Sequence, residues 1–295
     1  MTNTQNPFGA MYMRRGLNRR NFLRSAAAAG MAAGLPMFGT PAMAQTPVKG
    51  GILRAGLQGG ESTNTLDPAL AASEVPFAVN MTWGEMLLDV APDGALDYRI
   101  AEAISSNDDA TVWTLAIRQG VEFHDGSIVT PDDVVATLKR HTDENAQSGA
   151  LGIVQGISEM SAEGDMVTLK MVSANADLPF LIADYHLSIQ PGGGVDNPAA
   201  GNGTGAYKVT SNEPGVITTF ERNPNYWDSS LGHADSVEVL SINDNTARMN
   251  ALMTGQVDTI NRIDFNTEAL LKANPMLRIQ EVTGNQQYTF PMLTN

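Results

Sequence analysis

The stretch GVEFHDGSIVTPDDVV, residues 120–135, places a histidine, an aspartate and an acidic pair within sixteen residues. Either these side chains form a reaction centre, or they mark the turns of a fold. Val121 and Phe123 alternate with polar neighbours, which predicts a short strand with two apolar side chains on one face. Asp125-Gly126 is a dipeptide typical of tight turns between strands. The first half of the stretch therefore predicts a hairpin.

The second half has the signals of a helix start. Thr130 is a capping residue, Pro131 suits the first helical position, and Asp133 can bond back to the cap while it complements the helix dipole. Val134 and Leu138 then belong to a buried stripe. Every polar residue of the stretch thus has a structural task.

Chemical interpretations of the same residues find little support. A metal site at His124 and Asp125 would need further ligands, and the other three histidines (His141, His186 and His233) stand at no recognised ligand spacing. No Gly-x-Ser-x-Gly motif anchors a nucleophile. We expect no metal, no cofactor and no catalytic residue.

Two further motifs have structural explanations. The glycine-rich run at 191–207 lacks the Gly-Lys-Ser/Thr ending of a phosphate loop, so we expect a mobile loop that leads into a strand at 206–210. The pair Tyr226-Trp227 could stack a ligand, but aromatic pairs more often anchor a loop to the core, and we favour the anchor.

The flanking chain alternates as strands do. Residues 111–118 place Trp113, Leu115 and Ile117 on one face, and 52–57, 165–172 and 216–222 are likewise expected to form strands. Between them, apolar residues at helical spacing from 77 to 88 predict a helix that ends in a Pro-Asp-Gly turn.

Composition excludes several classes of protein. The chain has 295 residues, 42% hydrophobic and 17% charged, and this suits a globular protein. A net charge of −14 makes nucleic acid an unsuitable partner. The absence of cysteine excludes disulfides, thiolate metal sites and a lipid-modified cysteine. We therefore expect a protein without a lipid anchor.

The N-terminus predicts export. Residues 1–44 hold five of the 18 basic residues and none of the 32 acidic ones. Paired Arg19-Arg20 before an Ala/Gly-rich run resemble a twin-arginine export signal, and an ordinary secretory signal is the alternative. The Ala-Met-Ala sequence predicts cleavage between Ala44 and Gln45. We expect a soluble periplasmic protein that uses the twin-arginine export machinery.

Four segments, in order, carry a family resemblance. They are GGILRAGL with TLDPA, WTLAIRQGVEFHDGSIVTPDDVVATLKR, GTGAYKV with ERNPNYWD, and ALMTGQVDTI. Together they resemble the family 5 extracellular solute-binding proteins, the dipeptide- and oligopeptide-binding components of ABC importers. The departures are small: Ala206 stands where proline is usual, and Ala116 where a polar or charged residue is more common. In this family the His-Asp-Gly stretch is scaffold.

The resemblance implies a mixed-sheet α/β fold like that of periplasmic binding proteins, with two lobes that close over a solute. After the signal peptide expected at 1–44, it implies a first lobe of two subdomains at 45–257, and a hinge crossover with the start of a second lobe at 258–295. Family members are about twice as long, so we expect a chain truncated at its C-terminus that binds solute weakly or not at all by itself.

The resemblance also implies the function and the partners. We expect a monomeric receptor, not an enzyme, that captures a small solute, most simply a peptide, and delivers it to ABC permease subunits in the inner membrane. Alternatives are a chemoreceptor on the same fold, an exported hydrolase, or a receptor for a nickel complex, haem, a sugar or an opine.

Candidate contacts come from positions that match the cleft edge of the family. Arg262 can pair with a carboxylate, and Tyr288 heads the expected second-lobe strand. The full set of candidate solute-binding residues is Glu61, Ser62, Thr63, Asn261, Arg262, Tyr288, Tyr185 and His186.

Overall fold

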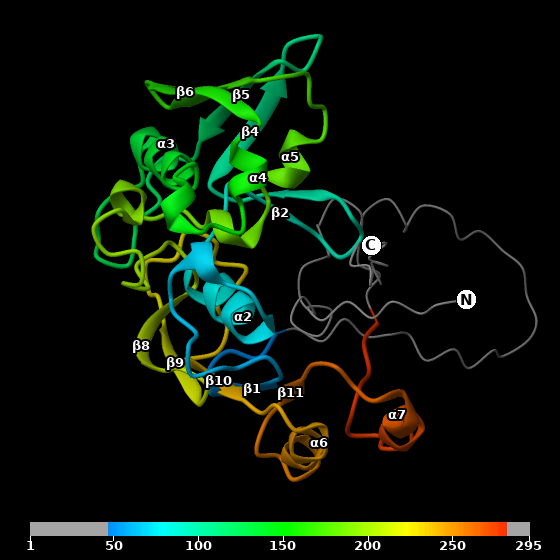
Figure 1. Ribbon diagram of the computed structural model, residues 1–295. Coiled ribbons are helices and arrows are strands. Elements are labelled where there is room, and N and C mark those ends of the chain that lie inside the picture. The colour runs from blue at the N-terminus through cyan, green and yellow to red at the C-terminus, as the bar shows by residue number, and fades with distance from the viewer. Residues whose placement is uncertain (1–46, 282–295) are drawn as a thin grey trace, which may run out of the picture.

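Two large sheets, each with its own apolar core, and one two-stranded sheet build the part of the chain that the computed structural model describes, residues 47–281 (Figure 1). The signal residues Arg19, Arg20, Ala44 and Gln45 and the candidate contact Tyr288 lie outside this range. No helix within 47–281 is both long enough and apolar enough to cross a membrane.

The first sheet has five strands in the order β11-β1-β10-β9-β8. Its parallel part is formed by β1 (Ile52–Leu57), which lies between β10 (Ser236–Ser241) and β11 (Thr259–Ile260). β9 (Ile217–Arg222) and β8 (Tyr207–Glu213) continue the sheet in antiparallel fashion. β11 is thus an edge strand of the first sheet, and the predicted lobe boundary at residue 257 falls just before it.

Helix α2 (Glu74–Trp83) packs on this sheet against β8 and β10. Trp83 is fully buried and, with Phe220, is the largest side chain of this core. Two further helices follow the parallel strands, α6 (Asn245–Met253) and α7 (Phe265–Lys272).

The second sheet is antiparallel, in the order β4-β5-β7-β6. Its strands and the neighbouring hairpin are β4 (Ala101–Ser106), β5 (Val112–Ile117), β7 (Met166–Met171), β6 (Ile157–Glu163), β2 (Leu88–Val90) and β3 (Leu96–Tyr98). Its helices and the 3-10 turns are α3 (Pro131–Arg140), α4 (Leu151–Val154), α5 (Leu178–Leu181), η2 (Pro68–Leu70), η3 (Glu144–Ala146), η4 (Tyr185–Leu187) and η5 (Pro191–Gly194).

Within residues 120–135 the tight turn and the helix start form as predicted, but the predicted strand is reduced to one bridge. A bridge between Glu122 and Ile128 closes the hairpin. Thr130 accepts a bond from the Asp133 amide, and the Asp133 side chain bonds back to the Thr130 amide, so α3 begins with a complete capping box. Val134 and Leu138 are fully buried beneath the second sheet. The strands predicted at 52–57, 111–118, 165–172 and 216–222 are also confirmed, as β1, β5, β7 and β9.

The helix predicted across residues 77–88 is wrong in extent. α2 ends at Trp83, and Leu88 belongs to strand β2. A methyl group at Gly84 would lie 2.8 Å from Ser188 Oγ. Because glycine has no side chain, the backbone can turn here, close to Ser188, and the helix ends. Leu88 is fully buried in the second core, so tertiary packing overrides the helical spacing.

The glycine-rich run begins in the 3-10 helix η5 and continues as a loop into β8, and it packs closely on the first core. A methyl group at Gly203 would lie 2.7 Å from the Trp83 ring, and one at Gly205 would lie 2.6 Å from the Trp83 carbonyl carbon. These glycines let the loop backbone approach Trp83 directly.

Candidate functional site at the carboxyl edge of the first sheet

The carboxyl ends of the three parallel strands meet at one edge of the first sheet. β1 leads into residues 58–63, β10 into residues 242–244, and β11 into Asn261 and Arg262. Ligands of open α/β sheets bind outside the carboxyl ends of parallel strands, where loops from neighbouring strands converge. This edge is therefore the candidate site.

Side chains from the segments after β10 and β11 hold residues 58–63, here called the first loop, in place. Asn243 Oδ1 accepts bonds from the amides of Gly59 and Gly60 at 2.9 and 3.2 Å, and its Nδ2 donates to the Gly60 carbonyl at 2.8 Å. Asn261 Oδ1 accepts from the Gln58 amide at 2.9 Å. The loop conformation is thus set before any ligand arrives.

The next three residues, Glu61, Ser62 and Thr63, are exposed. The Glu61 amide donates to Asn64 Oδ1 at 2.7 Å, which closes a tight turn. Their side chains therefore face solvent from a fixed backbone, as a contact surface requires.

Arg248 is the centre of this edge, and sequence reasoning missed it. The side chain is buried, 1% exposed, and donates to the carbonyls of residues 242, 243, 261 and 262 and to Asn245 Oδ1, at 2.6–3.2 Å. Burial and the nearby charge of Arg262 lower the pKa of Arg248. The signal in the sequence was an arginine three residues before Ala251, on the buried side of α6.

An ion pair crosses the edge between Arg262 and Glu74, the first residue of α2. The Arg262 side chain is 34% exposed and that of Glu74 is 13% exposed. The Arg262 backbone has φ of 51°, in the left-handed region, and its carbonyl accepts from Arg248 at 3.2 Å. A left-handed backbone in a residue other than glycine is a local strain that packing must maintain.

An aromatic pair continues the same face of α2. Phe77 lies one turn beyond Glu74, and its ring centroid is 4.1 Å from that of Tyr185 in η4. Phe77 is only partly buried, whereas Val75 and Val79 point into the core. Burial raises the pKa of the Tyr185 phenol.

His186 lies deeper than its neighbour. The ring is buried, with Nδ1 2.6 Å from Asp184 Oδ1 and Nε2 2.8 Å from the Ala71 carbonyl. Its contacts bind η4 to the chain before α2. The structure thus gathers Glu61, Ser62, Thr63, Asn261 and Arg262 at one edge and sets Tyr185 and His186 against α2. Asn261 (4% exposed) and His186 (7% exposed) lie inside the protein.

The His-Asp-Gly turn lies elsewhere and supports the glycine-rich loop. The His124 amide donates to the Gly203 carbonyl at 2.8 Å, and its Nε2 lies 3.0 Å from the Gly205 carbonyl. Burial lowers the pKa of His124. Within residues 47–281, no group of three or more potential metal ligands occurs. The contacts of His124 give this turn a structural role, and the expectation of no catalytic role stays a prediction.

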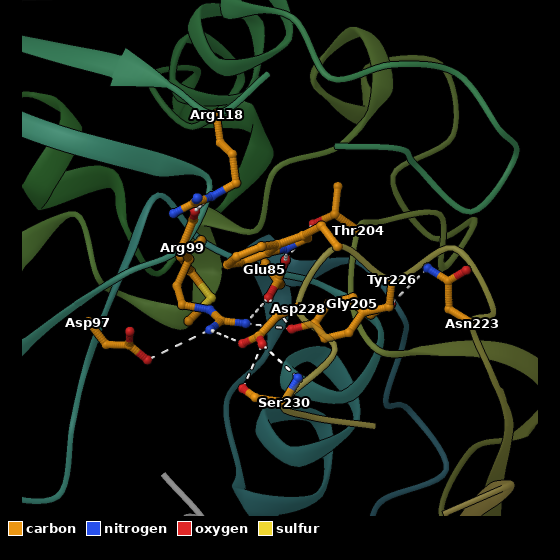
Figure 2. A network of polar contacts seen from close by, with 12 residues as sticks. Glu85, Asp97, Arg99, Arg118, Thr204, Gly205, Asn223, Tyr226, Asp228 and Ser230 are labelled. Carbon is orange, nitrogen blue, oxygen red and sulfur yellow. Dashed lines mark hydrogen bonds and ion pairs between the residues drawn. The ribbon is translucent and has the colours of Figure 1, made fainter. Parts of the chain in front are cut away.

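A second polar network joins the two cores (Figure 2). Glu85, which follows α2, forms a buried ion pair with Arg99, which precedes β4. Glu85 also accepts from Tyr226 Oη at 2.6 Å and from Trp227 Nε1 at 2.8 Å. The Arg118 guanidinium lies 4.3 Å from the Trp227 ring centroid. The anchor interpretation of Tyr226-Trp227 is confirmed, because both side chains bond to a buried carboxylate.

Comparison with known proteins gives two family matches. The model for the middle region of bacterial extracellular solute-binding proteins of family 5 matches residues 67–295. The signal sequence of the twin-arginine translocation pathway matches residues 16–36 and confirms the predicted export route.

Two curated relatives show what this chain is similar to. A probable peptide-binding protein, YejA, of Agrobacterium fabrum is 29% identical over 192 residues, which are 61% of this chain and 31% of the relative. The glutathione-binding protein GsiB of Salmonella typhimurium is 25% identical over 264 residues, 86% and 49% of the two chains. The chain thus spans about half, or less, of the length of the relatives it matches.

Solved structures agree with the mixed-sheet α/β fold of periplasmic binding proteins. The binding protein AgaA from A. tumefaciens R10, solved with agropinic acid, has a TM-score of 0.72 at 27% identity, over 76% of this chain and 46% of AgaA. DppA from Helicobacter pylori, solved with the peptide STSA, has a TM-score of 0.68 at 20% identity, over 77% and 50%. The second match concerns the fold alone.

Proposed function

Because this chain belongs to the bacterial extracellular solute-binding proteins of family 5, we propose that it captures a solute in the periplasm for an ABC importer. The family is one of binding proteins, and the twin-arginine signal carries the chain into that compartment. The protein alters no covalent bond of its solute, and its partner is the importer's permease in the inner membrane.

The observation that carries the proposal is the pre-shaped edge of the first sheet. Glu61, Ser62 and Thr63 project from a loop that Asn243 and Asn261 hold rigid. A binding site with a fixed backbone loses little conformational entropy when a ligand arrives. Arg262 supplies a partly exposed cation at the same edge.

Peptide is the solute that we propose first. YejA is a probable peptide-binding protein, and the exposed polar side chains and the cation at this edge suit a small zwitterion with a variable side chain. Ser62 and Thr63 can bond to a peptide backbone, and Arg262 to its carboxylate. The Phe77–Tyr185 pair offers an apolar wall for a side chain.

Two-dimensional NMR of the full chain tests this function, because it detects weak binding as well as tight binding. Titration with trialanine should shift the amides of residues 58–63 and leave those of β4–β7 in place. Agropinic acid, the ligand of AgaA, is the parallel arm for a non-peptide solute. Shifts confined to other surfaces, or cleavage of the peptide during the titration, would refute the proposal.

A further inference from the structure

The ion pair between Glu74 and Arg262 combines a fixed backbone with a side chain that can change its partner. Arg262 is the first residue after the buried Asn261, and the Arg248 guanidinium holds the carbonyls of both. The left-handed backbone at Arg262 is thus maintained by a side chain that is 99% buried. The Arg262 side chain is one-third exposed, so the ion pair lies at the protein surface and not in its core.

The partner of Arg262 is well placed to act as a substitute for a ligand. Glu74 begins α2, where the helix dipole favours a carboxylate. Its side chain packs on the first loop: a methyl group added at Gly59 would lie 2.5 Å from Glu74 Oε2. Ser73 Oγ donates to the Gly59 carbonyl at 2.6 Å, which fixes the α2 terminus to the same loop. The pair therefore lies beside Glu61, Ser62 and Thr63.

Arg248 and Arg262 differ in what can replace their partners. Arg248 is saturated by carbonyl oxygens of the chain itself, which no solute can displace without unfolding the edge. Arg262 pairs with a carboxylate side chain, and one-third of the Arg262 side chain remains exposed to solvent. A carboxylate that arrives from solution can offer Arg262 the same paired geometry.

From these contacts we infer that Glu74 occupies Arg262 as a built-in competitor, and that this edge selects solutes that carry a carboxylate. Binding exchanges the Glu74–Arg262 pair for a solute–Arg262 pair, while Arg248 keeps the backbone in place. Glu74 is a specificity-determining residue, since a neutral solute gains nothing from the exchange. The inference rests on the proposed function and names the chemical class of its solute.

The test uses acetate, the smallest carboxylate, so that it does not depend on any peptide. The Nε–H resonance of Arg262 is followed by NMR in the full chain and assigned by its loss in R262K. Acetate is titrated against sodium chloride at equal ionic strength and against neutral acetamide. We expect acetate alone to shift this resonance, and E74Q to lower the apparent dissociation constant for acetate about two- to fivefold.

Glu268 supplies a matched control. It pairs with Lys272 within α7, in a half-exposed ion pair away from the sheet edge, so E268Q should bind acetate as the unsubstituted chain does. Equal acetate affinity of E74Q and the unsubstituted chain, or equal effects of acetate and chloride, would overturn the inference. The trialanine titration decides the proposed function separately. Peptide shifts without an E74Q effect leave that function standing and reject Glu74 as the competitor.

Discussion

Arg248 shows how a single buried residue can set the shape of a binding edge. A buried cation is costly unless its donors are satisfied, and here carbonyls from two loops and the Asn245 side chain satisfy them. Those carbonyls belong to the turns after β10 and β11, so one guanidinium fixes both turns. The Asn243 side chain in turn accepts hydrogen bonds from the amides of Gly59 and Gly60, so the loop after β1 is fixed as well.

Replacing Arg248 should therefore cost more than replacing an exposed arginine. We expect R248Q to lower the free energy of unfolding by about 3 kcal/mol, because several buried carbonyls lose their donors. R222Q is the control, since Arg222 pairs with Asp235 at the surface, and its cost should stay below about 1 kcal/mol. Urea denaturation of the two variants measures both values, and equal costs would contradict the assigned role.

His141 predicts a dependence of stability on pH. The ring is fully buried, Nδ1 lies 2.6 Å from Ser148 Oγ, and Nε2 has no hydrogen-bond partner within residues 47–281. Burial, and next to it the charge of Arg140, lowers the pKa of His141 to about 4 from an ordinary value of 6.5. The folded protein thus resists protonation that the unfolded chain accepts.

The sign of the effect follows from this difference. Above pH 6.5 both states hold a neutral ring, so the free energy of unfolding is unaffected. As the pH is lowered from 6.5 to 4, the unfolded state binds a proton at His141 and the folded state does not. The free energy of unfolding therefore decreases over this range, by about 3 kcal/mol in all. Urea denaturation at several pH values across this range gives the free energy of unfolding as a function of pH. Its slope should be steeper for the unsubstituted chain than for H141Q, and equal slopes would contradict the assigned role of His141.

At the scale of elements, strands with a strict apolar–polar alternation were predictable, and so was the start of α3. One face of β5 covers a core, so every second residue of this strand is apolar, as Trp113, Leu115 and Ile117 are. This pattern can be seen in the sequence. The end of α2 was not predictable. Its apolar residues at 77 and 81 lie on the partly exposed face, and Gly84 ends the helix for a tertiary reason.

Two glycines offer a matched test of close packing. A methyl group at Gly203 would lie 2.7 Å from both the ring and the carbonyl oxygen of Trp83, whereas one at Gly152 in α4 would meet nothing within 4 Å. We expect G203A to cost about 1–3 kcal/mol through overpacking of the first core. G152A should be neutral or stabilise by about 0.4–1 kcal/mol, because alanine loses less backbone entropy in a helix. Thermal unfolding of the two variants compares them directly, and a harmless G203A would rule out the close approach.

At the scale of the molecule, the Glu85–Arg99 pair links two cores that lie under different sheets. Glu85 and Arg99 are 6% and 4% exposed, and Tyr226 reaches them from the turn after β9 (Figure 2). Trp227, the next residue, donates to Glu85 at 2.8 Å. The orientation of the first sheet relative to the second therefore depends on a few buried charges. Both cores should lose stability together when this joint is weakened.

Replacement of Arg99 tests the coupling. We expect R99M to cost about 3–5 kcal/mol, because it leaves the Glu85 carboxylate buried without its cation. Amide hydrogen exchange should then become faster in both sheets, in the paired strands β1 and β10 of the first and in the paired strands β5 and β7 of the second. D97N is the control, as Asp97 is 33% exposed and lies 3.7 Å from the same guanidinium, and its cost should stay below about 1 kcal/mol. Faster exchange in one sheet alone would show that the cores are independent.

The sequence by itself determined the local parts of this protein: the export signal, the alternating strands, the capping box of α3 and the order of motifs that marks its family. Each of these depends on residues a few positions apart, whose spacing the sequence records directly. Only the tertiary structure decided that the loops after β1, β10 and β11 meet at one edge. It also decided that Arg248 holds that edge, and that Glu74 faces Arg262 across 188 residues of chain. Such contacts depend on strand order and packing, because parallel pairing brings distant segments together without any local signal in either one.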